Sequence, residues 1–379
     1  MRIRRAGVVV LATVLAALLP ATVNAAPYTL FTNVADSTGP FSTFGTASLN
    51  ETGGVAFFAT LDSGDRGVFR GANVATDTVA SSAGPFAATG WDNAPVIGNN
   101  GKVVFGADLD AGGYGIFTGG NPATDTLGST TAAGGAFQHV IGSAMSRQGT
   151  QIFYHGRVGN IGFPANVYRG PNPANDLVID MLPLGGWATR IDVNDSGTVA
   201  FQNSGIYKGQ SNATIVPVAA GAGPYNAFQT DPAINNPGTV AFLAGLVAGG
   251  SGVFKGPNPA TDTIADSAGP FSSFNSVDIN DAGLVAFQAA KDAGGSGIYV
   301  GPNLINDKVI ATGDPLFGST VSSVGFYRGL NNNGDIAFAY QLANGQRGIA
   351  IATVPEPTGI ALLSAASTML LARRRRDVA

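Results

Sequence analysis

Hydrophobic and polar positions form one pattern that recurs seven times along the chain. Each copy has an apolar residue, a short polar turn ending in Gly, and an apolar run ending in Phe. The copies are LNETGGVAF (49–57), IGNNGKVVF (97–105), MSRQGTQIF (145–153), VNDSGTVAF (193–201), INNPGTVAF (234–242), INDAGLVAF (279–287) and LNNNGDIAF (330–338). All seven keep the Gly, and five begin the turn with Asn, which Gly98 and Ser146 replace in the other two. The glycines are Gly53, Gly101, Gly149, Gly197, Gly238, Gly283 and Gly334.

Turn chemistry accounts for this motif without a ligand. Asn at the first position of a turn bonds to its own backbone, and Gly at the fourth accepts the left-handed conformation that starts the returning strand. The motif therefore predicts a hairpin connection with a bulge at the Gly. The Val-Ala-Phe run is apolar on both faces, which predicts an inner strand sandwiched between neighbouring sheets.

Further strands complete each unit. A second motif follows each copy at GVFRG (67–71), GIFTG (115–119), NVYRG (166–170), GIYKG (205–209), GVFKG (252–256), GIYVG (297–301) and, degenerate, GIAIA (348–352). A third element, as in NPATDTIADSAGPF, predicts a turn and another strand. About four antiparallel strands per repeat predict an all-β fold, a seven-bladed β-propeller. A different blade count or an open β-array are alternatives. We expect closure by docking of the first blade against the last, with little strand exchange.

Composition restricts the class of function. Gly (54) and Pro (21) are abundant, but 45% of the residues are hydrophobic, so the glycines indicate turns between short strands rather than disorder. Residues 26–354 carry 13 basic and 22 acidic side chains, and this net charge of −9 argues against nucleic-acid binding. With no Cys and two His, the chain has no disulfides, thiolate metal sites or His-rich metal site.

The N-terminus has the three parts of a secretory signal peptide. MRIRR is basic, AGVVVLATVLAALLP is apolar, and ATVNA ends in small residues, which predicts cleavage after Ala25. The predicted organisation is a signal peptide (1–25), a propeller of seven repeats (26–353) and a C-terminal segment (354–379).

Candidate sites in the body have plain structural explanations. Asp62 and Asp65, and Asp108 and Asp110, have Ca²⁺-like spacing, but no copy completes a calcium loop, and solvated hairpin turns explain them. His139 and His155 flank the least regular copy of the repeat, near Arg157, Trp187 and Arg190 in sequence. Ordinary sequence drift explains this irregularity, and a binding feature grafted on the scaffold is the alternative. The repeated aromatics of GPF and GPY are expected to pack rather than to stack on sugars; they are Phe41, Phe86, Phe271 and Tyr225.

The C-terminal segment carries the most specific motif. An apolar run of about 15 residues, 358–372, is short for a membrane span, which needs about 20. It lies between Pro355-Glu356-Pro357 and four arginines (Arg373, Arg374, Arg375 and Arg376) that would act as stop-transfer charges. This arrangement resembles the PEP-CTERM sorting signal of Gram-negative bacteria. The resemblance implies a transient inner-membrane helix, cleavage near Pro-Glu-Pro by an exosortase, and release to a biofilm or exopolysaccharide matrix. The body resembles the propeller-like N-x-x-G repeat proteins that carry this tail.

The sequence therefore predicts an exported, surface- or matrix-sorted propeller. Its expected role is a structural or interaction module rather than an enzyme, with no cofactor and no metal, and with the exosortase and a surface partner such as exopolysaccharide as partners. The alternatives are a propeller enzyme acting on extracellular carbohydrate and a Ca²⁺- or ligand-binding propeller. An enzyme should place several non-repeated polar residues around one mouth of the central channel.

Overall fold

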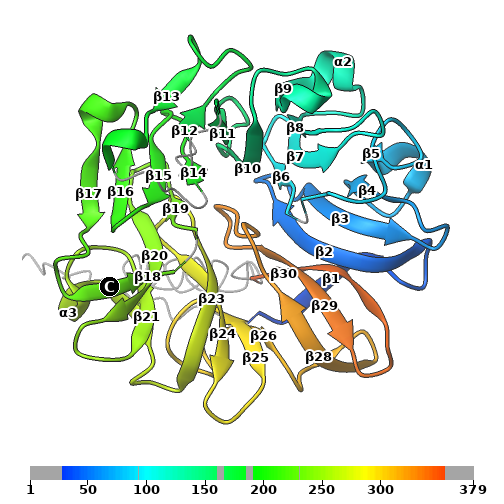
Figure 1. The fold of residues 1–379 in the computed structure, drawn as a ribbon. Coiled ribbons are helices and arrows are strands. Elements are labelled where there is room, and N and C mark those ends of the chain that lie inside the picture. Colours follow the sequence, from blue (N-terminus) through cyan, green and yellow to red (C-terminus); the bar gives the residue numbers. More distant parts are fainter. Residues whose placement is uncertain (1–27, 93, 160–165, 185–190, 230, 355–379) are drawn as a thin grey trace, which may run out of the picture.

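Seven small antiparallel sheets lie radially around a central axis (Figure 1). The structure is a computed structural model and describes residues 28–92, 94–159, 166–184, 191–229 and 231–354. The fold is an all-β, seven-bladed β-propeller, which confirms the architecture predicted from the repeat. The signal peptide and the hydrophobic helix expected in the tail lie outside the described residues.

Each blade is numbered in chain order, and its strands run from the channel outward. Blade 1 contains β2 (Phe41–Leu49), β3 (Val55–Leu61), β4 (Arg66–Phe69) and β5 (Thr78–Ser81). Blade 2 contains β6 (Val96–Ile97), β7 (Val103–Asp108), β8 (Tyr114–Phe117) and β9 (Thr126–Ser129). Blade 3 contains β10 (His139–Met145), β11 (Ile152–Arg157), β12 (Asn166–Tyr168) and β13 (Leu177–Ile179). Blade 4 contains β14 (Ile191–Val193), β15 (Val199–Gln202), β16 (Ile206–Gly209) and β17 (Val216–Ala219).

The last three blades follow the same plan with local additions. Blade 5 has an inner strand in two pieces, β18 (Tyr225–Phe228) and β19 (Ala233–Ile234), followed by β20 (Val240–Leu246), β21 (Ser251–Phe254) and β22 (Thr263–Asp266). Blade 6 contains β23 (Phe271–Ile279), β24 (Val285–Lys291), β25 (Ser296–Tyr299) and β26 (Lys308–Ala311). Blade 7 contains the hairpin β27 (Pro315–Leu316) and β28 (Ser319–Gly325), then β29 (Ile336–Leu342), β30 (Arg347–Thr353) and β1 (Leu30–Asp36).

Helical structure in the described residues is limited to single turns. They are α1 (Val74–Asp77), α2 (Pro122–Asp125), α3 (Pro259–Asp262), η1 (Thr131–Ala133), η2 (Leu182–Leu184) and η3 (Asn212–Thr214). The three α-turns are the predicted Asn-x-Ala-Thr-Asp turns. In α3 the Asn258 side chain accepts from the Ala260 N–H at 3.0 Å, while Asp262 accepts from the Asn258 N–H at 2.9 Å, so both side chains close the turn.

The hydrophobic core is divided into layers between adjacent blades. In blade 1, Ala56 packs toward blade 2, whereas Val55 and Phe57 pack toward blade 7, and these three side chains are at most 3% exposed. The Val-Ala-Phe strand is therefore covered on both faces, as predicted. It is the second strand of its blade, and the segment that enters the Asn turn is the innermost.

Closure of the ring differs from our expectation. The N-terminal strand β1 pairs antiparallel with β30, from Leu30 opposite Thr353 to Asp36 opposite Gly348. The start of the chain thus supplies the outermost strand of the last blade. The expectation of closure with little strand exchange was wrong because the seventh repeat ends after its third strand, leaving an open edge that the first strand fills.

Candidate functional site

The repeated Asn turns gather at one mouth of the central channel, where each Asn joins two blades. In blade 6, Oδ1 of Asn280 accepts from its own turn, from the Leu284 N–H at 2.9 Å, and Nδ2 donates to the Asn331 carbonyl of blade 7 at 3.2 Å. All five asparagines are 6% exposed or less. Equivalent bonds to the next blade come from Asn50 (3.1 Å), Asn194 (3.2 Å), Asn235 (2.9 Å) and Asn331 (3.4 Å), the last reaching blade 1. Each Asn therefore stabilises its own turn and also bonds its blade to the next one.

The residue after each Asn forms a second set of inter-blade bonds. The Asp281 N–H donates to Oδ1 of Asn332 at 2.8 Å, and the Asn332 N–H donates to Oε2 of Glu51 at 2.6 Å. The same bond is made by Glu51 to Asn99 (2.9 Å), Asp195 to Asn236 (2.9 Å) and Asn236 to Asp281 (2.8 Å). These bonds crowd polar groups around the axis.

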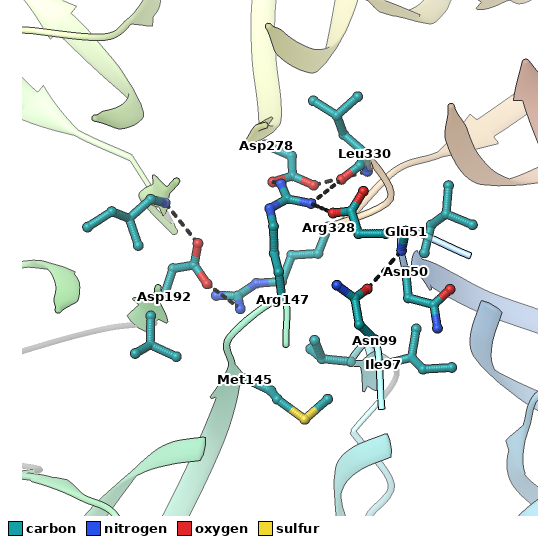
Figure 2. Close-up of a pocket in the computed structure, with 14 residues that line it drawn as sticks. Asn50, Glu51, Ile97, Asn99, Met145, Arg147, Asp192, Asp278, Arg328 and Leu330 are labelled. Atoms are coloured by element: carbon teal, nitrogen blue, oxygen red, sulfur yellow. Dashed lines mark hydrogen bonds and ion pairs between the residues drawn. The ribbon is translucent and has the colours of Figure 1, made fainter. Parts of the chain in front are cut away.

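Blade 3 departs from this scheme. Arg147 follows Ser146, the residue that replaces the turn Asn in this blade. The bond from the Asn99 N–H of blade 2 therefore goes to the Arg147 main-chain carbonyl, at 2.7 Å, and not to its side chain. Its guanidinium reaches across the channel (Figure 2). It forms an ion pair with Glu51 of blade 1 at 3.2 Å and donates to the Leu330 carbonyl of blade 7 at 2.9 Å and the Ile279 carbonyl of blade 6 at 2.7 Å. One side chain thus links four blades.

A second arginine crosses the same space. Arg328, from the segment before the Asn turn of blade 7, forms an ion pair with Asp192 of blade 4 at 2.7 Å and donates to the Ile191 carbonyl. The two side chains are only 9% and 12% exposed. Burial alone would lower the pKa of Arg328, but the negative groups around it, of which Asp192 has the largest effect, together raise the pKa above its ordinary value, so the guanidinium stays charged. Asp192 also accepts from the Ile234 N–H at 2.8 Å, which fixes the carboxylate.

The second buried carboxylate, Asp278, is in a different electrostatic state. It accepts from the Leu330 N–H at 3.1 Å and lies 3.8 Å from the Arg147 guanidinium. Burial raises its pKa to about 6, against the lowering effect of Arg147. Burial dominates because the separation from the guanidinium is long and Asp192 adds a like charge.

Little space remains between these groups. The cavity that they line has a volume of about 40 Å³. At about 10–15 Å³ for each water molecule, it holds about three waters. The five charged side chains at this mouth (Glu51, Arg147, Asp192, Asp278 and Arg328) are occupied with one another and with main-chain groups, so the arrangement forms a plug rather than a substrate pocket.

The sequence-predicted positions fall elsewhere or serve the fold. All seven repeat glycines have positive φ, between 74° and 88°. The GPF and GPY aromatics are fully buried, and Tyr225, for example, packs 4.9 Å from Phe254 between ring centroids. The packing interpretation is therefore confirmed for Phe41, Phe86, Tyr225 and Phe271.

The structure describes the metal candidates and both histidines, but only part of the surroundings expected for the histidines. Within the described ranges, no group of three or more His, Cys, Asp or Glu side chains is placed to hold a metal ion. His155 is buried in β11, and His139 is exposed at the start of β10. Ala25, the Pro355–Pro357 motif and Arg373–Arg376 lie outside the described residues, as do Trp187 and Arg190.

Sequence reasoning missed the charged residues of the plug. Arg147 was visible as the one basic residue at a turn position that holds Glu, Asn or Asp in the other copies. Asp192 and Asp278 occupy the same position, two residues before the turn Asn, in the sequences Asp-Val-Asn and Asp-Ile-Asn. Arg328 has no counterpart in the repeat, and no local pattern places it opposite Asp192.

Comparisons with known proteins add little to this description. No known family model matches the chain, and no curated protein matches its sequence. One similar solved structure is the extracellular domain of a B. thetaiotaomicron protein assigned as a hybrid two-component system, with 14% identity and a TM-score of 0.43 over 86% of this chain. This chain spans only 40% of that one.

Two further solved structures are similar. The WD40 repeats of RRP9 match with 10% identity and a TM-score of 0.43, covering 86% of this chain and 100% of that one. Kuenenia stuttgartiensis hydrazine synthase matches with 12% identity and a TM-score of 0.36, covering 66% and 73%. At these levels of similarity the neighbours carry no functional information. Separately, none of the helices in the described residues has the length and apolar character needed to cross a membrane.

Proposed function

We propose that the chain is an exported β-propeller that is sorted to the cell surface or extracellular matrix and acts there as a structural or interaction module. The observation that carries the non-enzymatic part is the plugged channel mouth. An enzyme was expected to place non-repeated polar residues there, and Arg147 and Arg328 are such residues. Both guanidiniums, however, form ion pairs with carboxylates of other blades. The remaining 40 Å³ is far below the 300–1,000 Å³ of typical ligand pockets.

The sorting part of the proposal rests on the two ends of the sequence. A signal peptide ending at Ala25 directs export, and the Pro-Glu-Pro, apolar and arginine-rich tail resembles an exosortase substrate. The last strand, β30, ends at Thr353, immediately before this tail, so cleavage near Pro355–Pro357 leaves the propeller whole.

Fractionation of the native host tests the sorting. We expect a C-terminally truncated protein at the surface or in the matrix, identified by the mass of its C-terminal peptide, and full-length protein in the inner membrane of a strain that lacks the exosortase. Full-length protein retained in the inner membrane of the normal host would contradict the proposal.

A further inference from the structure

The predicted signal peptide and the C-terminal segment both join the propeller at one edge of blade 7. Leu30, the first residue of β1, lies opposite Thr353, the last residue of β30, in the antiparallel pairing of these two strands. Tyr28 and Val354, which flank the two strands in sequence, pack in the same hydrophobic cluster. The two segments therefore leave the propeller from neighbouring points. We call the edge formed by Tyr28, Leu30, Thr353 and Val354 the exit edge.

The exit edge lies on the side of the ring that carries the plugged mouth. The Tyr28 hydroxyl donates to the carbonyl of Gly334, the turn glycine of blade 7, at 2.8 Å, and the Tyr28 side chain is buried. On β30, Ala352 pairs with Ile336, which follows this glycine by two residues. Asn331 of the same turn bonds to blade 1. Tyr28 therefore fixes the exit edge beside the turns that surround the plug.

A short stretch of chain separates the exit edge from the apolar run of the tail. Only Pro355–Pro357 lie between Val354 and that run, 358–372. Four residue steps of fully extended chain span at most about 14 Å, so an apolar run inserted in a bilayer would hold the exit edge within about 14 Å of the point where the run enters the membrane. On the other strand of the edge, the predicted cleavage position at Ala25 is three steps from Tyr28, or about 11 Å at most.

The surface at and beside the exit edge suits contact with lipid. Leu30 is 55% exposed, and Ile305, in the turn that joins β25 to β26 on the plug side of blade 6, is 78% exposed. Single exposed apolar side chains are common on soluble proteins, so these two acquire a role only through the short connection to the tail. Residues 26–354 carry a net charge of −9, from 13 basic and 22 acidic side chains. The connection, rather than attraction to anionic lipid, must therefore hold this edge at the bilayer.

We propose that the short connection holds the exit edge of blade 7 against the lipid bilayer while the tail is in the membrane, with Leu30 at the lipid interface. The hairpins on the opposite side of the ring then point away from the bilayer. In blade 5, for example, β20 has seven residues, which places the hairpin 247–250 about 20 Å from the plug side. The side of the propeller that remains open to a matrix partner is therefore the side opposite the plug.

This assignment rests on the proposed sorting, and fluorophores attached to single cysteines test it in a chain that has no natural Cys. The protein is exported with its own signal peptide in a host without an exosortase, so that the tail stays attached. It is then labelled with a polarity-sensitive fluorophore and reconstituted in phosphatidylcholine vesicles that contain a lipid with a nitroxide on its headgroup. The nitroxide quenches fluorescence only at close range.

Three labelled positions and one longer connection make the test specific. Leu30→Cys should be quenched at least about threefold more than Val247→Cys, because Val247 is an equally exposed apolar position about 20 Å away along the strands. Ser364→Cys, within the apolar run, should show a blue-shifted emission that reports insertion of the tail. Insertion of 20 Gly/Ser residues after Val354 lengthens the connection to about 25 Å, so quenching at Leu30→Cys should fall while the Ser364→Cys emission stays the same.

Three outcomes would overturn the proposal. They are equal quenching at Leu30→Cys and Val247→Cys, quenching at Leu30→Cys that the inserted linker does not reduce, and no blue shift at Ser364→Cys. The first two remove the orientation of the propeller but leave the sorting proposal standing, because the tail is still inserted. The third means that the tail does not enter the bilayer, and it contradicts the sorting proposal as well.

Discussion

Breaking the Arg328–Asp192 pair should destabilise the propeller by much more than a surface ion pair contributes. Both side chains are at most 12% exposed, and their N–O distance is 2.7 Å. Removing one partner of a buried pair costs about 3–5 kcal/mol because the other charge stays buried, whereas exposed pairs contribute about 0–1 kcal/mol. In Arg328→Met, Asp192 keeps its bond from the Ile234 N–H. We therefore expect a loss near the lower end, about 3 kcal/mol.

The assay is urea unfolding of Arg328→Met, Asp192→Asn and the double variant, followed by circular dichroism. The double variant should be less destabilised than the sum of the singles, by about 1.5 kcal/mol or more, because it leaves no unpaired charge. Lys308→Met is the matched control, since Lys308 pairs with Asp314 at 2.6 Å but is 33% exposed, and it should cost about 0–1 kcal/mol. If the single variants lose less than about 1 kcal/mol, or the losses simply add, the plug does not hold the ring as argued.

Three further predictions follow from the same structure. Burial raises the pKa of Asp278 from 3.8 to about 6, so the stability that its protonated form contributes is complete below about pH 4 and is lost as the pH rises through 6. Relative to Asp278→Asn, the wild type should therefore lose about 3 kcal/mol of unfolding free energy between these pH values. Parallel pH profiles of the two proteins would contradict this. Asn280→Ala removes an inter-blade latch and leaves buried main-chain groups unpaired, so urea unfolding should show a loss of about 1–3 kcal/mol, against almost none for the exposed Asn306→Ala. In a chain without cysteine, Thr32→Cys/Ile351→Cys places two thiols at paired positions of β1 and β30, and oxidation should raise the thermal midpoint reversibly with dithiothreitol; an unchanged midpoint in the oxidised form would refute the pairing.

The repeat predicted the architecture because its signals are local. Gly at a left-handed position and an apolar strand buried on both faces are properties of a few neighbouring residues, so one sequence was enough to predict four-stranded blades and their number. The aromatic packing of Phe41 and its equivalents was predictable for the same reason, since a residue recurring at one blade position serves the blade.

The site was harder to predict because its contacts join residues far apart in the chain. A turn pattern shows that Asn50 bonds its own backbone, but it does not show that the other end of the amide reaches the next blade. Arg147 lies in the least regular copy of the repeat, and the local sequence does not show that its long side chain crosses the channel to three other blades. Ring closure was missed because the seventh repeat has three strands, and the partner of β30 lies at the opposite end of the sequence.

The pairing of β1 with β30 also determines the order in which the ring can assemble. Strands within a blade are joined by short connections, whereas Leu30 and Thr353 are more than 300 residues apart. Closing that loop costs about 2.5 kcal/mol more in chain entropy than closing a 20-residue hairpin. We therefore expect β1 to pair with β30 only after the intervening blades have folded. Until then, the outer edge of β30 is unpaired and open to other chains. A neighbouring molecule can offer the same strand to that edge, which makes the pairing of β1 with β30 the point where domain-swapped oligomers would form.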